Sequence, residues 1–159
     1  MYDKDQIADV IREVLTDLSI NTIIPVSEDA VHILMMLGAH ESHFGTYLKQ
    51  KGGGPALGFY QIEPPTEKDV LRYLREGSKT QWKRDLYNYL MGFPNEALKM
   101  NLWYQTVIAR VKLWMITEPL PSKDDLPAMA MYCKQHWNTD AGKAKPEDYL
   151  VAYKRYVRG

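Results

Sequence analysis

The sequence predicts an α+β fold that is predominantly helical and carries one small β insertion. Apolar residues recur at helical spacing over most of the chain, beginning with the stretch from Ile7 to Leu18. This period is lost between residues 45 and 65, where the loop-forming run Gly52-Gly53-Gly54-Pro55 precedes an apolar segment from Leu57 to Ile62. An apolar segment of that length behind a glycine-rich turn favours a short strand.

The length and composition indicate one domain over residues 1–159. A chain of 159 residues is typical of a single domain, and its apolar fraction of 45% is too high for a disordered chain. The net charge is zero and the bases are scattered, which argues against a nucleic-acid-binding surface. There is no apolar run of the roughly 18 residues that a membrane helix needs. The first residues carry acids where a signal peptide carries bases, so we expect synthesis in the cytoplasm without membrane insertion.

The N-terminal part predicts two helices of different character. Residues 7–18 present apolar side chains on one face, which indicates a helix that packs on one side. Ser27 has the properties of an N-cap, with Glu28 and Asp29 at the positive end of the helix that follows. That helix, from Ala30 to about Glu41, is apolar nearly all round, so we expect it in the middle of the domain.

Helical patterns resume after the proline pair at 64 and 65 and continue to the end of the chain. The first of these helices is predicted to begin at a Thr66 cap and to end near Gly77. The remaining helices are predicted over Thr80–Met91, Asn95–Thr117, Ser122–His136 (with Ser122 as its cap) and Pro146–Tyr156.

The cysteine and histidine content argues against a metal site or a thiol nucleophile. The single cysteine, Cys133, excludes an internal disulfide, and it is predicted in the middle of a helix, although His136 lies one turn further on. His40 and His43 flank Glu41 without the His-Glu-x-x-His spacing of zinc hydrolases. We therefore expect no metal and no cofactor, an inert thiol, and two histidines at the rim of a cleft.

Glu41 is the most informative residue for function. It ends the most apolar helix of the chain and directly precedes the irregular segment. Burial and the negative end of the helix dipole both favour the protonated form of a carboxyl group at such a position. A carboxylic acid that keeps its proton near neutral pH can protonate the leaving oxygen of a glycosidic bond. The alternative is a solvated glutamate at a helix end.

Two motifs around this glutamate resemble the soluble lytic transglycosylase and goose-type lysozyme superfamily. The pair Glu41-Ser42 closes a buried helix, and Gly58-x-x-Gln61-Ile62 follows in the order and at the interval found in the family, with Pro64 and Thr66 behind it. The resemblance implies a lysozyme-like fold that cleaves the bond between N-acetylmuramic acid and N-acetylglucosamine in peptidoglycan.

A third family motif, an alanine followed by a tyrosine in a late helix, is matched less fully. Ala128 and Tyr132 fit it, but Cys133-Lys134 stands where the family continues with an asparagine. With this motif included, the resemblance extends over about residues 28–156.

By this resemblance Glu41 is the catalytic acid and afterwards the base, and Tyr132 positions it. The residues expected to bind the sugar are Ser42, Gly58, Tyr60 and Gln61. Each of the short motifs also has a structural interpretation. Ser42 could satisfy carbonyls at the helix end, Gly58 could be a turn residue, and Tyr132 could be a core aromatic residue.

The kind of cleavage depends on Glu63. Family members with one catalytic glutamate form a 1,6-anhydro product, whereas an inverting hydrolase needs a second carboxylate about 6.5–9.5 Å from the acid. Glu63 stands where some goose-type lysozymes carry an acid, and strand alternation would place it on the same face as Gln61. The alternative is a solvent-exposed side chain. We favour the transglycosylase reaction, because Glu41-Ser42 is its better-known marker, and leave the two-carboxylate muramidase open.

The small size, the lack of a signal peptide and the lack of a wall-binding module predict a phage endolysin or virion-associated lysozyme. Such a protein reaches the cell wall in the periplasm through a holin or with the phage particle. Two alternatives stay open: a non-catalytic glycan-binding structural protein of the phage, and a chitinase-like enzyme.

Overall fold

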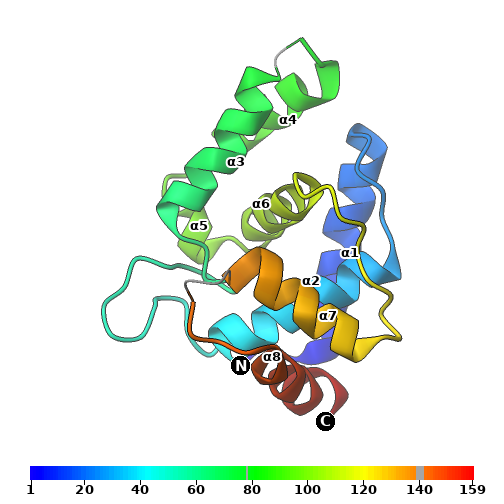
Figure 1. Cartoon of the computed structure of the whole chain (residues 1–159). Helices are drawn as coiled ribbons and strands as arrows, with labels where there is room; N and C mark the ends of the chain where they lie inside the picture. The colour runs from blue at the N-terminus through cyan, green and yellow to red at the C-terminus, as the bar shows by residue number, and fades with distance from the viewer. Residues whose placement is uncertain (78, 139–141) are drawn as a thin grey trace.

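The structure, a computed structural model, describes residues 1–77, 79–138 and 142–159, and these form helices joined by loops (Figure 1). The elements in chain order are α1 (Lys4–Asn21), α2 (Glu28–Ser42), α3 (Pro64–Glu76), α4 (Gln81–Met91), α5 (Ala97–Met100), α6 (Leu102–Trp114), α7 (Leu126–Cys133), the π-helical turn η1 (Lys134–Asn138), α8 (Pro146–Tyr153) and the π-helical turn η2 (Lys154–Arg158). None of the helices in the described part of the chain is long and apolar enough to cross a membrane.

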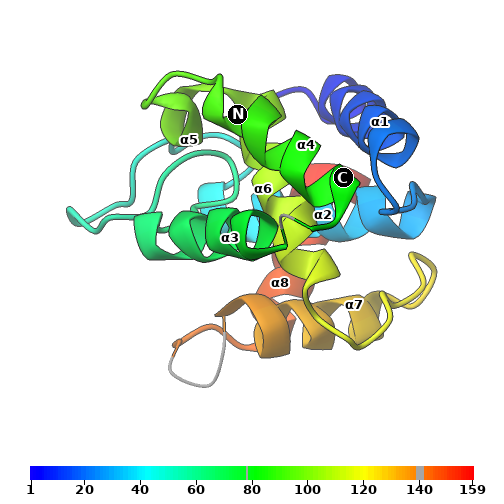
Figure 2. The same cartoon turned by 90° about the horizontal axis from the view of Figure 1, so that it is seen from above.

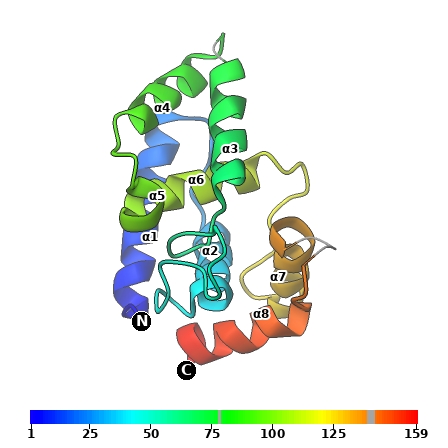
Figure 3. The same cartoon turned by 90° about the vertical axis from the view of Figure 1, so that its left-hand side faces the viewer.

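Helix α2 forms the centre of the fold, as its all-round apolar pattern predicts. It packs against α1, α6, α7 and α8, and Figures 2 and 3 show it between α1 on one side and α7 on the other. Helices α3 and α4 form an antiparallel pair that extends away from this centre (Figure 1). The end of α2 that carries Glu41 therefore lies among segments far apart in the sequence.

The predicted β insertion is not found in the described residues, so the α+β fold class is wrong and the fold is mostly helical. The segment Leu57–Ile62 is a turn, in which Gly58 has a φ of 80° and Gln61 a φ of 49°. These left-handed residues reverse the chain, so that the amides of Leu57 and Ile62 donate to each other's carbonyls over 3.0 and 2.9 Å. The apolar run misled the prediction because Phe59 and Tyr60, at the tip of the turn, are buried in the helical core.

The helix predictions near both chain ends are confirmed, and the errors concern breaks and caps. The helix predicted over Asn95–Thr117 is interrupted at Asn101, which has an extended conformation and accepts a hydrogen bond from the Tyr104 amide as the N-cap of α6. Helix α3 begins at Pro64 instead of following a Thr66 cap, since proline fits the first turn of a helix.

The helix predicted from Ser122 begins only at Leu126. Its N-cap is Asp125, whose side chain accepts a hydrogen bond from the Ala128 amide over 3.1 Å. It ends at Cys133 and continues as the π-helical turn η1. The cap was assigned to the wrong residue because serine and aspartate both satisfy the first amides of a helix.

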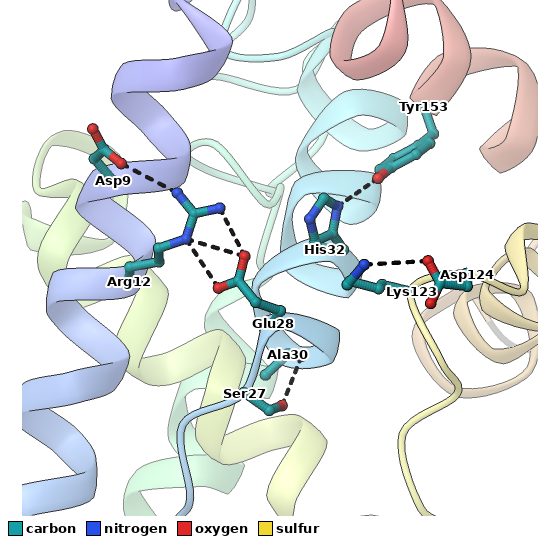
Figure 4. A network of polar contacts seen from close by, with 9 residues as sticks. All are labelled: Asp9, Arg12, Ser27, Glu28, Ala30, His32, Lys123, Asp124 and Tyr153. Carbon is teal, nitrogen blue, oxygen red and sulfur yellow. Dashed lines mark hydrogen bonds and ion pairs between the residues drawn. The ribbon is translucent and has the colours of Figure 1, made fainter.

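A polar network fixes the N-terminal end of α2 (Figure 4). Arg12 of α1 donates to both carboxylate oxygens of Glu28, over 2.9 and 2.8 Å. The Ser27 hydroxyl caps the helix, as predicted. One turn further on, Nδ1 of His32 lies 2.6 Å from the Tyr153 hydroxyl of α8. These contacts join α2 to α1 on one side and to α8 on the other.

Candidate active site

A cleft of about 670 Å³ lies beside the C-terminal end of α2. It is formed by the end of this helix, the loop of residues 43–63, the start of α3, one residue of α6 and the region of η1. Its lining residues are Glu41, His43, Tyr47, Gln50, Lys51, Ala56, Gln61, Ile62, Glu63, Thr66, Lys112, Trp137, Asn138 and Gly142. Three of the predicted site residues, Glu41, Gln61 and Glu63, thus line one cleft.

Neutral or weakly basic groups hold the Glu41 carboxyl at the cleft. Its side chain is 17% exposed, and Oε1 accepts a hydrogen bond of 2.7 Å from the Tyr149 hydroxyl of α8. Nδ1 of His40 lies 3.4 Å from the same oxygen, and its ring packs on Tyr149 with 4.0 Å between centroids. Among the described residues, Oε2 of Glu41 has no hydrogen-bond partner, so this oxygen is free to face a ligand.

Tyr149 is buried and keeps its proton. Burial raises the pKa of Tyr149 strongly, and the Glu41 carboxylate raises it further, because an ionised phenol would face a like charge. The hydroxyl is therefore a permanent hydrogen-bond donor to Glu41. Since it donates to Oε1, the proton of a neutral Glu41 belongs on Oε2, on the side without a described partner.

Tyr149, not Tyr132, is the tyrosine that contacts Glu41. Tyr132 is also buried, but its hydroxyl has no hydrogen-bond partner in the described part of the chain, and it does not line the cleft. Its ring packs against His136 of η1, with 4.6 Å between centroids. The positioning role predicted for Tyr132 is therefore corrected. The packing of α8 on α2 places the Tyr149 hydroxyl, and not that of Tyr132, against the Glu41 carboxyl group.

Ser42 and Tyr60 are buried completely and do not line the cleft. The Ser42 hydroxyl donates to the Gly38 carbonyl and accepts from the Gly45 amide, so it closes the end of α2. The Tyr60 hydroxyl lies 2.9 Å from that of Thr106 on α6. Neither residue has a surface that a sugar could reach. The sugar-binding roles expected for Ser42 and Tyr60 are therefore corrected: both are buried structural residues.

Gly58 is required by backbone geometry. Its φ of 80° is a left-handed conformation, and a Cβ atom there would lie 2.4 Å from Oε1 of Gln105 and 2.5 Å from the Leu98 carbonyl. Helices α5 and α6 approach the turn at this point. Gly58 is thus the turn residue of the structural interpretation, packed against the protein's own atoms, and it does not line the cleft.

Gln61 and Glu63 reach the cleft from the turn, without a strand. The Gln61 side chain donates a hydrogen bond of 2.9 Å to the Gly58 carbonyl. Its amide oxygen has no partner among the residues that the structure describes, so it is free to accept one from a ligand. Glu63 is exposed and occupies the N-cap position of α3 without capping it. Strand alternation was the wrong reason for grouping these two residues, although both line the cleft.

Lys112 and Trp137 are cleft residues that the sequence analysis did not single out. Nζ of Lys112 lies 3.9 Å from the centroid of the Trp137 ring. Burial lowers the pKa of Lys112, and the nearby carboxylates of Glu41 and Glu63 counteract this shift. One signal was available in the sequence, since a lysine between the apolar residues Val111 and Leu113 needs a partner or a function. No such signal in the sequence distinguishes Tyr149 from the other ten tyrosines as a residue of the site.

No group of three histidine, cysteine, aspartate or glutamate side chains is placed to bind a metal in the described ranges. Cys133 is buried, and burial raises the pKa of its thiol well above the usual value, which makes the thiolate inaccessible near neutral pH. The chemistry available in the cleft is therefore that of carboxyl groups, amides, histidine and lysine.

Comparisons of this chain with protein-family models, with characterised proteins and with solved structures find no match.

Proposed function

We propose that this protein cleaves the glycosidic bond between N-acetylmuramic acid and N-acetylglucosamine in peptidoglycan strands. The observation that carries the proposal is the state of Glu41. Its carboxyl group is mostly withdrawn from solvent and is held through Oε1 by a tyrosine that keeps its proton. The residue lines the cleft, and its other oxygen has no described partner. A carboxyl group that is oriented by one oxygen and has no described partner at the other can exchange a proton with a bound glycan.

Glu41 acts first as acid and then as base. Its Oε2 proton passes to the glycosidic oxygen as the bond to the muramic acid C1 breaks. The carboxylate then removes the proton from the muramic acid 6-hydroxyl, whose oxygen bonds to C1 and gives a 1,6-anhydro sugar. Tyr149 donates to Oε1 throughout, which orients the carboxyl group and stabilises its ionised form after the first proton transfer.

The cleft walls suit an N-acetylated sugar. The amides of Gln50, Gln61 and Asn138 can exchange hydrogen bonds with hydroxyl and N-acetyl groups, and the rings of Tyr47 and Trp137 offer apolar surface. A lining that is mostly polar, with two aromatic rings, suits a ligand rich in hydroxyl and amide groups. The place of action we propose is the bacterial cell wall, for a phage endolysin or virion-associated lysozyme.

A two-carboxylate muramidase is the second candidate, and Glu63 supports it. Glu63 lines the same cleft as Glu41 and is exposed, so it could activate a water for hydrolysis. The product distinguishes the reactions, because an anhydro muropeptide is lighter than the hydrolysed one by one water.

The decisive experiment adds the protein to purified peptidoglycan sacculi and follows turbidity. We expect the wild type to clear the suspension and Glu41→Gln to leave it turbid, with Glu28→Gln as a matched control at the other end of α2. Binding of sacculi by the wild type without clearing would support a non-catalytic glycan-binding protein instead. Release of sugars from chitin oligomers at a similar rate would indicate a chitinase-like enzyme.

A further inference from the structure

We propose that Lys112, held against Trp137, is an anion-binding subsite that selects strands whose muramic acid carries a free lactyl carboxylate. The inference rests on the proposed function and adds a specificity determinant to it. Lys112 belongs to α6 and lines the same cleft as Glu41 and Glu63.

Lys112 is costly to the fold in its present surroundings. It is half-buried in a helix whose neighbouring residues, Val111 and Leu113, are buried and apolar. It forms no ion pair with a carboxylate among the described residues, and the Trp137 ring, 3.9 Å from Nζ, stabilises the ammonium only in part. The lowered pKa of Lys112 has the same origin, because burial outweighs the two carboxylates nearby.

Lys112 has no ion-pair partner among the described residues, although Glu41 and Glu63 line the same cleft. A lysine bound directly to Glu41 would keep that carboxyl ionised and would prevent it from acting as an acid. Holding Nζ against the indole keeps the ammonium out of ion-pair contact with Glu41 while leaving it in the cleft. An anion supplied by the substrate completes the site without disturbing the acid.

The lactyl carboxylate fits this requirement by chemistry and by place. The lactyl group is attached to the muramic acid ring whose C1 is attacked, so its carboxylate is the acidic group closest to the bond that Glu41 cleaves. Strands from which the stem peptides have been removed carry it as a free anion, whereas chitin has no such group. A half-buried ammonium binds a carboxylate by a charge-assisted hydrogen bond, which is stronger than a bond between neutral groups.

The test measures binding by calorimetry in the inactive Glu41→Gln background. The probes are peptide-free glycan strands and the same strands after conversion of their carboxylates to neutral methylamides. Lys112→Met should weaken binding of the acidic strands about tenfold or more and leave binding of the methylamidated strands unchanged. The loss should shrink as salt is added. Lys112→Arg, which keeps the charge, should retain the preference for acidic strands.

The matched control is Lys83→Met. Lys83 is also half-buried over an aromatic ring, with Nζ 4.2 Å from the Tyr73 centroid, but it lies outside the cleft. Replacing Lys83 should change neither the affinity for the acidic strands nor that for the methylamidated strands. Three results would overturn the subsite. Lys112→Met could weaken binding of both kinds of strand equally or of neither, or Lys112→Arg could weaken binding of the acidic strands as much as Lys112→Met does.

Failure of the subsite and failure of the proposed function give different results. If the wild type clears sacculi but Lys112→Met keeps the preference for acidic strands, only the subsite is refuted. If the wild type clears nothing and the Glu41→Gln protein binds neither kind of strand, the proposed function is refuted and the subsite with it.

Discussion

The two ends of helix α2 each carry a glutamate, and their surroundings differ in every respect. Glu28 lies at the positive end of the helix, its side chain is 47% exposed, and the Arg12 guanidinium holds its pKa below the usual range. Glu41 lies at the negative end, is 17% exposed, and has Tyr149 and His40 as partners. The first arrangement is an exposed ion pair, whereas the second places a mostly buried carboxyl group beside the hydroxyl of a buried tyrosine.

Glu41→Gln has the largest expected effect. The amide has nearly the same volume but no transferable proton, so cleavage of sacculi should fall by a factor of about 10² or more. The free energy of unfolding should change little, because glutamine keeps the size of the side chain and an oxygen that can accept the Tyr149 hydrogen bond. Turbidity and thermal unfolding check the two statements. A variant that kept a tenth of the wild-type activity would contradict the acid role.

Tyr149→Phe should have the next largest effect, a decrease of about tenfold in kcat, since one hydrogen bond to a charged group is worth about 1.5–3 kcal/mol. KM should change little, because Tyr149 acts through Glu41 and does not line the cleft. Tyr132→Phe is the matched control, as its hydroxyl has no described partner, and it should leave kcat unchanged. Equal effects of the two substitutions would show that Tyr149 is merely a core residue.

Glu63→Gln should leave the rate of cleavage largely unchanged if Glu41 works alone. The released muropeptides, measured by mass spectrometry, should then be 1,6-anhydro products in both the wild type and the variant. Hydrated products from the wild type that disappear in Glu63→Gln would establish the two-carboxylate mechanism.

Glu28→Gln should have the smallest effect, a loss of at most about 1 kcal/mol in the free energy of unfolding near pH 7, because its ion pair is exposed. Since Arg12 lowers the pKa of Glu28, the stabilisation is present above the ordinary value of about 4.5 and is lost as the pH falls through the lowered pKa. Urea unfolding at several pH values should show the wild type and the variant converging in acid. A difference that persisted in acid would mean that the charge is not its cause.

Local signals in the sequence determined the helices and part of the site. The apolar periodicity and the Ser27 cap predict α2 and its central place, because capping and amphipathic pattern depend on neighbouring residues. The glutamate at its end and the motif around Gln61 point to two positions that line the cleft. The same local reasoning predicted a strand over residues 57–62, because an apolar run looks alike whether it is extended or folded into a buried turn.

Only the tertiary structure decided which distant side chains complete the site. Tyr149 reaches Glu41 across 108 residues of sequence because α8 packs on α2, and Lys112 meets Trp137 because α6 and η1 border the same cleft. Tyr132 and Tyr149 are both buried tyrosines in late helices, yet one hydroxyl has a carboxylate partner and the other has none among the described residues. Composition and spacing cannot separate them, since the difference arises from the packing of helices that the local sequence does not specify.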